Sequence, residues 1–266
     1  MNRWCWTVCA LLALTMLFGA NDANAGSRND KNKSKFTPEQ LVDFSKQVER
    51  VAASQGARVF ILSRLGRPQS DLTEGIQFTH TAIGVYSNIT LEDGTTTPGY
   101  AIYNLYMKVG DDTKSELVMD FPVDFFAGAE LLKAGITVPD EKVQKRLLEL
   151  IQSGRYAKLH NPKYSTLSNP YNSQFQNCTE FVLDVLNAAI YQSVNKAQLK
   201  ANTRAYFNAQ PIKMSGLKLS LGAMFMDELT LEDHHSKVKT ATFTTITNYL
   251  RDNDLLQHHE VVRWAE

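Results

Sequence analysis

The stretch from Asn177 to Ile190 constrains the fold most, because it reads as one buried helix together with its first turn. Asn177 is a favourable N-cap residue, and Glu180 follows three positions later, at the spacing of a capping box. Apolar side chains then recur at the helical period, namely Phe181, Val182, Val185, Leu186, Ala189 and Ile190. The sequence therefore predicts a helix that packs its apolar stripe against another element.

Cys178 falls in the first turn of this predicted helix. Free backbone N–H groups and the positive end of the helix dipole favour a thiolate there, and lower a thiol pKa from its usual value of about 8.5. The position suits a nucleophilic cysteine. The alternative is a small core residue, because free cysteines are among the most buried side chains.

The first 25 residues have the features of a secretory signal peptide. Arg3 supplies positive charge, residues 4–20 are almost entirely apolar, and Ala23-Asn24-Ala25 offers a small-x-small cleavage site. A retained membrane anchor is the alternative, but the apolar run is short for a span. We therefore expect a periplasmic or secreted protein, cleaved near Ala25.

Removal of the signal peptide leaves a single cysteine. Cys5 and Cys9 belong to the predicted signal, so Cys178 has no partner for a disulfide in the mature chain. Exported proteins usually pair their cysteines or avoid them, and a lone thiol in such a protein is a candidate reactive group.

Composition narrows the class of protein. The 28 basic residues balance 28 acidic ones, so the charge gives no reason to expect nucleic-acid binding. A hydrophobic content of 43% is enough for an ordinary packed core. Residues 26–36 are polar and lysine-rich and predict a disordered leader. Residues 37–266 predict one domain with a C-terminal extension and no further membrane span.

The remaining pattern mixes helices and strands and predicts an α+β fold around an antiparallel sheet. A helix is expected from Pro38 to about Gly56, introduced by a Thr37/Gln40 capping box. Strands are expected over 58–62, 78–86, 100–109, 117–121 and 260–264, the second and third forming a hairpin. Further helices are expected over 124–133, 139–154, 196–209 and 243–250, and a β segment or wrapping arm over 211–225.

A long aperiodic loop over 159–176 leads into the cysteine helix. Loops of this length inside a compact domain are usually functional or disordered, and its aromatic residues favour a function. Tyr164 and Tyr171 are therefore candidate substrate contacts. They could equally be residues that pin the loop to the core.

His80 is the candidate base for the thiol, because a cysteine nucleophile needs a group that takes its proton. Strand alternation places His80 on one face with Phe78, Ala82 and Gly84. The two small residues would let a helix approach closely and bring Cys178 within reach. The alternative is a core histidine satisfied by one hydrogen bond.

Asn104 lies among apolar residues in the neighbouring predicted strand. A polar amide in such a strand needs a buried hydrogen-bond partner, and neighbouring strands lie close enough for side-chain contact. Asn104 is thus a candidate to orient the imidazole. An amide bonded to the backbone at a sheet edge is the alternative.

Two segments, Thr79–Tyr86 and Gln176–Val182, together resemble the circularly permuted NlpC/P60 branch of papain-fold proteins, in which the histidine strand precedes the cysteine helix. More narrowly, the chain resembles an exported bacterial family of unknown function, DUF2145. The resemblance implies a papain-like α+β fold, with the cysteine helix packed on a central antiparallel sheet. It implies Cys178 as nucleophile and His80 as base, and the third polar position of that branch falls on Asn104.

The function implied is hydrolysis or transfer of acyl groups at amide or ester bonds of peptides, lipids or cell-wall substrates, without a cofactor. The backbone N–H of Cys178 would hold the oxyanion with help from Gln176 or Gln174. A rival from another class is an inactive envelope protein that keeps the fold for binding or assembly.

The remaining histidines and two aspartates are weaker candidates for a metal site or for catalysis. The pairs His234-His235 and His258-His259 lack metal-ligand spacing, and we expect no metal. His160 is an alternative base. Asp120 and Asp124 bracket Phe121-Pro122 and are interpreted as turn and cap residues.

Overall fold

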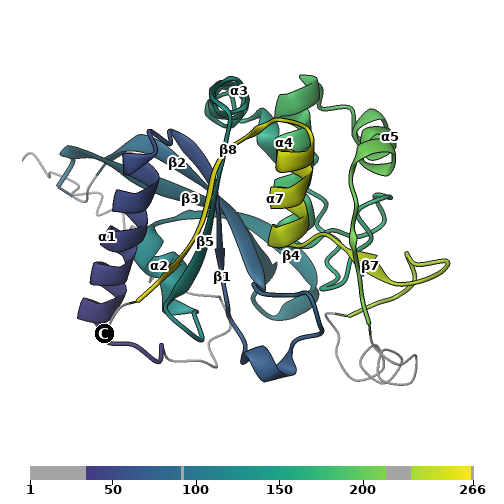
Figure 1. Ribbon diagram of the computed structural model, residues 1–266, viewed down its shortest axis with the longest axis horizontal. Coiled ribbons are helices and arrows are strands. Elements are labelled where there is room, and N and C mark those ends of the chain that lie inside the picture. The colour runs from purple at the N-terminus through teal and green to yellow at the C-terminus, as the bar shows by residue number, and fades with distance from the viewer. Residues whose placement is uncertain (1–33, 91–92, 214–228, 265–266) are drawn as a thin grey trace, which may run out of the picture.

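The computed structural model describes residues 34–90, 93–213 and 229–264, so the predicted signal peptide and most of the leader lie outside it. The described chain is a mixed α+β structure built on a six-stranded antiparallel sheet (Figure 1). Every neighbouring pair of strands runs antiparallel. Across the sheet the strands are β4 (Asp111–Asp120), β3 (Thr96–Lys108), β2 (His80–Thr90), β1 (Val59–Arg64), β5 (Lys133–Pro139) and β8 (Leu256–Arg263).

One face of the sheet is covered by α1 (Pro38–Ser54) and α2 (Pro122–Ala127). The predicted capping box starts α1: Thr37 Oγ1 accepts the N–H of Gln40, and the Gln40 side chain accepts the N–H of Thr37. Phe44 of α1 and Phe126 of α2 meet edge to face, with 4.8 Å between ring centroids. These aromatic rings fill the core on this face.

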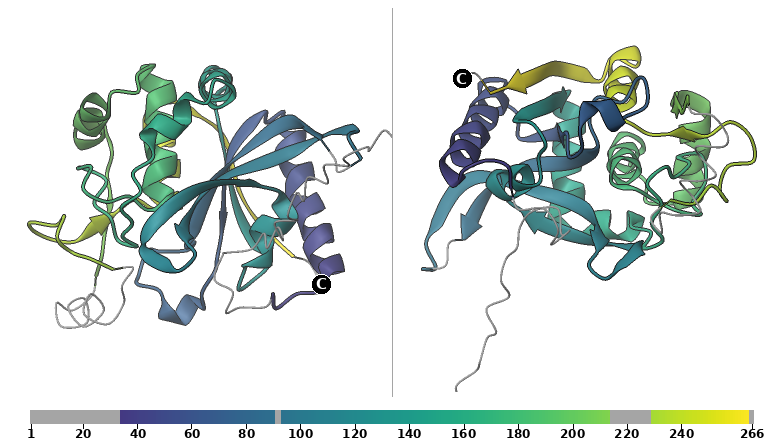
Figure 2. Two further views of the ribbon diagram at one scale, coloured as in Figure 1. Left: turned by 180° about the vertical axis from the view of Figure 1, so that it is seen from behind. Right: turned by 90° about the horizontal axis from the view of Figure 1, so that it is seen from below.

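The opposite face is covered by α3 (Glu141–Gln152), α4 (Cys178–Tyr191) and α7 (Phe243–Asp252), while α5 (Lys196–Tyr206) packs against α4 (Figures 1 and 2). The predicted apolar stripe of the cysteine helix lies in this second core. It packs on strand residues that point to the same side, among them Ile61, Ile83 and Val85. The expected packing of the cysteine helix on an antiparallel sheet is therefore confirmed.

Short elements complete the described chain: the 3-10 turns η1 (Gln69–Asp71) and η2 (Arg155–Leu159), and a ribbon of β6 (Gln210–Pro211) and β7 (Lys239–Thr240). The β segment or arm expected over 211–225 lies mostly outside the described residues. None of the described helices combines the length and apolar character needed to cross a bilayer.

Strand β5 corrects the sequence interpretation. A helix was expected over 124–133, but α2 ends at Ala127 and the chain then enters β5. Six of the seven β5 residues are buried, because β5 lies between β1 and β8 with helices on both faces. A strand buried on both faces shows no polar alternation, so its sequence lacks the usual signal. Gly135 within β5 makes room for the ring of Phe243, which a Cβ would approach to 2.4 Å.

Candidate active site

Cys178 is the first residue of α4, as predicted. Its N-cap Asn177 accepts the backbone N–H of Glu180 through Oδ1 at 2.8 Å. The thiol donates to the carbonyl oxygen of Thr79 across 3.9 Å, and the residue is only 6% exposed. Burial raises the pKa of the Cys178 thiol, although the backbone N–H of Thr81 and the charge of Arg64 oppose this. The expected lowering of the pKa is wrong, because desolvation outweighs the helix terminus.

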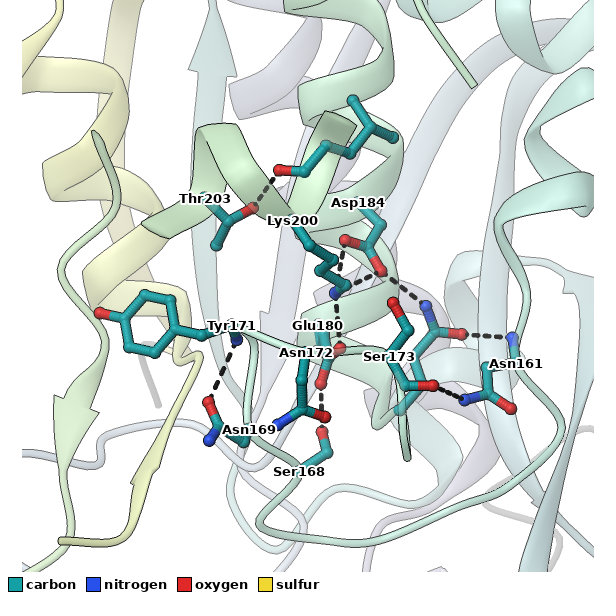
Figure 3. A network of polar contacts seen from close by, with 12 residues as sticks. Asn161, Ser168, Asn169, Tyr171, Asn172, Ser173, Glu180, Asp184, Lys200 and Thr203 are labelled. Carbon is teal, nitrogen blue, oxygen red and sulfur yellow. Dashed lines mark hydrogen bonds and ion pairs between the residues drawn. The ribbon is translucent and has the colours of Figure 1, made fainter. Parts of the chain in front are cut away.

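The Glu180 side chain does not complete a capping box. The N-cap N–H of Asn177 donates to Ser168 Oγ at 3.0 Å, and that hydroxyl donates to Glu180 Oε2 at 2.6 Å. Glu180 Oε1 accepts from Lys200 at 2.7 Å, and Lys200 also binds Asp184 at 2.8 Å (Figure 3). Burial and the neighbouring Asp184 raise the pKa of Glu180, while Lys200 opposes them. Glu180 therefore fastens the cysteine helix to the preceding loop and to α5.

His80 begins β2 and lies directly opposite Arg64 in the register of β1 and β2. Its ring stacks on Tyr106, with 4.7 Å between centroids and 5° between planes, and also contacts Phe125 of α2. Nε2 of His80 lies 3.1 Å from Oδ1 of Asn104. Burial and the charge of Arg64 lower the pKa of His80 to about 3, so the imidazole is neutral at neutral pH.

Asn104 determines which nitrogen of the ring carries the proton. Its amide nitrogen donates to Asp120 Oδ1 at 2.7 Å and to the carbonyl oxygen of Ile102 at 3.1 Å. Because both amide hydrogens are donated, Oδ1 accepts, and Nε2 of His80 donates. Nδ1 of the ring therefore keeps a lone pair. The structure thus brings His80 and Asn104 together, with Asp120 behind them.

Asp120 is the end of this polar chain. Its second oxygen accepts the hydroxyl of Tyr106 at 3.1 Å. Burial raises the pKa of Asp120 to about 7, and Asp124 adds to the rise, while the hydrogen bonds from Tyr106 and Asn104 oppose it. The interpretation of Asp120 as a turn residue is wrong. Asp124 does act as a cap, because its Oδ2 accepts the N–H of Phe121 at the start of α2.

A cavity of about 1040 Å³ opens at this end of the sheet, and both Cys178 and His80 line it. The two side chains approach it from opposite faces of β2. Thr179, beside Cys178, donates to Thr81 at 3.1 Å on the α4 face, whereas the His80 ring packs on Phe125 on the α2 face. No hydrogen bond joins the thiol and the imidazole among the described contacts. The walls also include Arg64, Tyr106 and Tyr164.

The predicted approach of the cysteine helix over Ala82 and Gly84 is wrong. Gly84 lies opposite Phe60 in the register of β1 and β2, and a Cβ there would lie 2.5 Å from the Phe60 ring. Gly84 therefore makes room for an aromatic ring on the α1 face. Helix α4 packs on the alternate residues of the same strand, such as Ile83.

Phe78 also departs from the predicted face. Its ring meets Phe243 of α7 edge to face, with 5.1 Å between centroids. It therefore belongs to the core on the α4 side, while His80 contacts α2.

The predicted oxyanion donor Gln176 is engaged elsewhere. Its Oε1 accepts the N–H of Asn161 at 2.8 Å, and its Nε2 donates to Asp184 at 2.8 Å and to the carbonyl oxygen of Leu159 at 3.2 Å. Gln176 is buried and is not among the cavity walls. Its amide holds the loop before the cysteine helix.

The two loop tyrosines differ. Tyr171 donates its hydroxyl to the carbonyl oxygen of Phe207 and accepts the N–H of Ala209, both at 3.0 Å. It therefore pins the loop to the segment after α5, away from the cavity. Tyr164 lines the cavity, where a substrate contact remains a prediction.

The other histidines lie outside the cavity walls. Nε2 of His160 lies 2.9 Å from Ser115 Oγ, and burial lowers the pKa of His160. Within the described ranges, no three His, Cys, Asp or Glu side chains gather closely enough to hold a metal ion.

Arg64 is a site residue that the sequence interpretation missed. It ends β1, is 2% exposed and lines the cavity. Its Nη1 donates to the carbonyl oxygen of Gly128, and its guanidinium lies over the Phe125 ring, 5.4 Å from the centroid. The available signal was a charged residue that directly continues an apolar strand. Tyr106 and Asp120, likewise missed, are polar groups inside or ending apolar strands.

The sequence of the chain matches one family model. A family model described as an uncharacterized protein conserved in bacteria, DUF2145, matches residues 51–250, which include every residue of the site described above. No curated protein matches the chain, and no solved structure does. Because the match covers most of the sequence, the chain belongs to the bacterial family DUF2145.

Proposed function

We propose that this protein is an exported cysteine-dependent hydrolase or acyltransferase with a permuted NlpC/P60-like, papain-like arrangement. Cys178 is the nucleophile, His80 the general base, and Asn104 the residue that orients His80. The substrates are amide or ester bonds, with cell-envelope peptides as the leading class. The predicted signal peptide supports a periplasmic or extracellular location.

One observation carries the proposal. The hydrogen bond from His80 Nε2 to Asn104 holds the neutral imidazole in the tautomer whose free nitrogen is Nδ1. The base lines the same cavity as a lone cysteine at a helix N-terminus. A thiol and a base that is oriented by a third group are the components that nucleophilic catalysis needs, and the candidate site contains all three.

The reaction follows from these roles. As Sγ attacks the substrate carbonyl carbon, Nδ1 of His80 takes the thiol proton. The backbone N–H of Cys178 donates to the oxygen on which negative charge develops. When the carbon–nitrogen or carbon–oxygen bond breaks, the imidazolium returns its proton to the leaving group and a thioester remains. Water, or a second amine or hydroxyl, then attacks the thioester with His80 again as base.

Before substrate binds, the thiol of Cys178 and the imidazole of His80 are both neutral at neutral pH. The pKa of Cys178 is raised and that of His80 is lowered, both by burial. Proton transfer therefore accompanies attack rather than preceding it. Because the two groups approach the cavity from opposite faces of β2, proton transfer requires one bridging water or a closer approach when substrate binds.

The test is a trapped thioester. The purified protein is mixed with an activated ester and quenched in acid, and peptide mass spectrometry locates the acyl group. We expect acylation at Cys178, abolished in Cys178→Ser and slowed about 10²- to 10⁴-fold in His80→Ala. His160→Ala is the matched control, because that histidine is likewise partly exposed but lies outside the cavity walls.

A non-catalytic envelope protein that retains the fold is the second candidate. The buried thiol with its raised pKa favours it, since such a thiol is inert. Equal acylation rates in the parent protein and in His80→Ala would establish this alternative.

A further inference from the structure

Arg64 is a buried cation that forms no direct ion pair within the described ranges. Its charge lowers the pKa of the nearby Asp120, but its Nε has no hydrogen-bond partner. Its guanidinium donates to the backbone carbonyl of Gly128, lies over the face of the Phe125 ring and interacts with the hydroxyl of Tyr106. A buried charge is costly unless it is paired and hydrogen-bonded, so this arrangement is incomplete by itself.

The place of Arg64 suggests what would complete it. Arg64 lines the cavity that also contains Cys178 and His80. Its charge favours the thiolate of Cys178 and disfavours protonation of His80, so its field reaches both groups. An anion bound there would lie beside the proposed reacting atoms.

The other charges on the walls narrow the choice of anion. Arg67 and Lys108 are basic, while Asp71, Asp111 and Asp112 are acidic, and all five are exposed or partly exposed. Exposed charges are screened by water and salt, whereas a buried guanidinium is not. One buried cation with acidic neighbours at the rim suits a single carboxylate better than a multiply charged phosphate. Guanidinium groups also match carboxylates in geometry.

We propose that Arg64 binds a carboxylate of the ligand, so that the cavity selects acyl compounds carrying a free carboxylate near the bond presented to Cys178. The identification of that ligand as a substrate rests on the proposed function. The binding itself does not. The carboxylate can be a peptide C-terminus or an acidic side chain, and the probes below distinguish them.

Binding is measured by calorimetry on the full chain carrying Cys178→Ser, which prevents turnover. Three probes are compared: acetyl-alanine, acetyl-alanine amide, and acetyl-glutamic acid with its C-terminus amidated. We expect at least one acid to bind about 10- to 100-fold more tightly than the alanine amide, as a charged hydrogen bond implies. A preference for acetyl-alanine identifies a C-terminal carboxylate, and a preference for the glutamate probe identifies a side chain.

Two substitutions test Arg64 itself. Arg64→Met should abolish the preference for acid over amide, and Arg64→Lys should reduce it, because lysine keeps the charge but loses the planar fork. Lys108→Met, which removes an exposed cation from the same walls, should leave it unchanged. Circular dichroism checks the fold of each variant, and if Arg64→Met is unfolded the Arg64→Lys result decides.

Equal affinity of acid and amide probes for the Cys178→Ser protein, or an unchanged preference in a folded Arg64 variant, would overturn the inference. Equal affinities are also expected if Arg64 stabilises only the oxyanion of the reaction and binds no carboxylate of the ligand. Failure of the proposed function has a different signature: Cys178 is never acylated, yet the carboxylate preference and its dependence on Arg64 persist.

Discussion

The imidazole of His80 and the amide of Asn104 meet with 3.1 Å between Nε2 and Oδ1. The same amide donates to Asp120, so the orientation of the ring depends on a polar chain that continues away from the cavity. The base and the nucleophile of the candidate site are therefore held by different parts of the fold. The chain from Asn104 to Asp120 holds the base, while α4 holds the thiol on the other face of β2.

Asn104→Ala should lower the acylation rate of Cys178 more than it lowers ground-state binding. Loss of the amide frees the imidazole to change tautomer and rotate, and we expect a fall of about 10²-fold. The free energy of unfolding should drop by about 1–3 kcal/mol, because Asp120 loses a buried donor. Acylation kinetics and urea unfolding measure the two effects. An unchanged rate in a folded variant would assign Asn104 a structural role only.

Asp120→Asn should change how stability depends on pH. The pKa of Asp120 is raised to about 7 in the folded state, against about 3.9 in unfolded chains. The folded state therefore binds the extra proton between these values, and this contribution to stability is fully present below about pH 4. It is lost as the pH rises through about 7. The parent should therefore lose unfolding free energy relative to Asp120→Asn over that range, because asparagine does not titrate.

His80 should make the free energy of unfolding depend on pH in the opposite direction to Asp120. Its pKa is lowered to about 3, whereas an unperturbed histidine titrates near about 6.5. Between these two pKa values His80 binds a proton in the unfolded chain but not in the folded state. The free energy of unfolding therefore decreases as the pH falls from about 6.5 toward about 3. Nuclear magnetic resonance of the His80 ring should show no titration between about pH 7 and 4.5. A midpoint near about 6.5 would contradict this prediction.

Alkylation of Cys178 by iodoacetamide should be slow at neutral pH and rise steadily with pH, because the raised pKa keeps the thiol protonated. The unfolded protein in urea serves as the reference thiol. A fast, pH-independent reaction near neutrality would indicate a preformed thiolate and would contradict the neutral resting pair.

Lys200→Met should destabilise the fold strongly. The substitution leaves Glu180 and Asp184 buried without their cation, which costs about 3–5 kcal/mol in comparable pairs. Lys46→Met is the matched control, because its pair with Glu49 is exposed and such pairs are worth about 0–1 kcal/mol. Chemical unfolding of both variants measures the difference. Similar losses would mean that Lys200 is not a buried anchor of α4.

Local patterns in the sequence were sufficient for much of the fold. Thr37 and Pro38 predict the start of α1, and the apolar period after Asn177 predicts α4, because caps and periodicity depend on nearby residues. Strand β5 was missed because its burial comes from strands far away in the chain. The Glu180 capping box failed for the same reason, since Lys200 competes successfully for the carboxylate.

In the candidate site too, the features that depend on residues far apart in the chain could not be predicted from local sequence. His80 and Cys178 were singled out from their local settings, and Asn104 from its apolar strand. Alternation alone does not reveal that Phe60 fills the space over Gly84, so it could not show that α4 covers the other face of β2. Arg64 and Asp120 become site residues only when the strands that carry them pair with their neighbours.

The most direct test of the account is a crystal structure of the protein with Cys178 covalently bound to a peptide aldehyde, which mimics the tetrahedral intermediate. We expect Nδ1 of His80 to lie within about 3.2 Å of the sulfur or the new hydroxyl oxygen, or to reach it through one water, while Nε2 stays hydrogen-bonded to Asn104. An adduct in which β2 still separates the imidazole from the sulfur, with no connecting water, would contradict it.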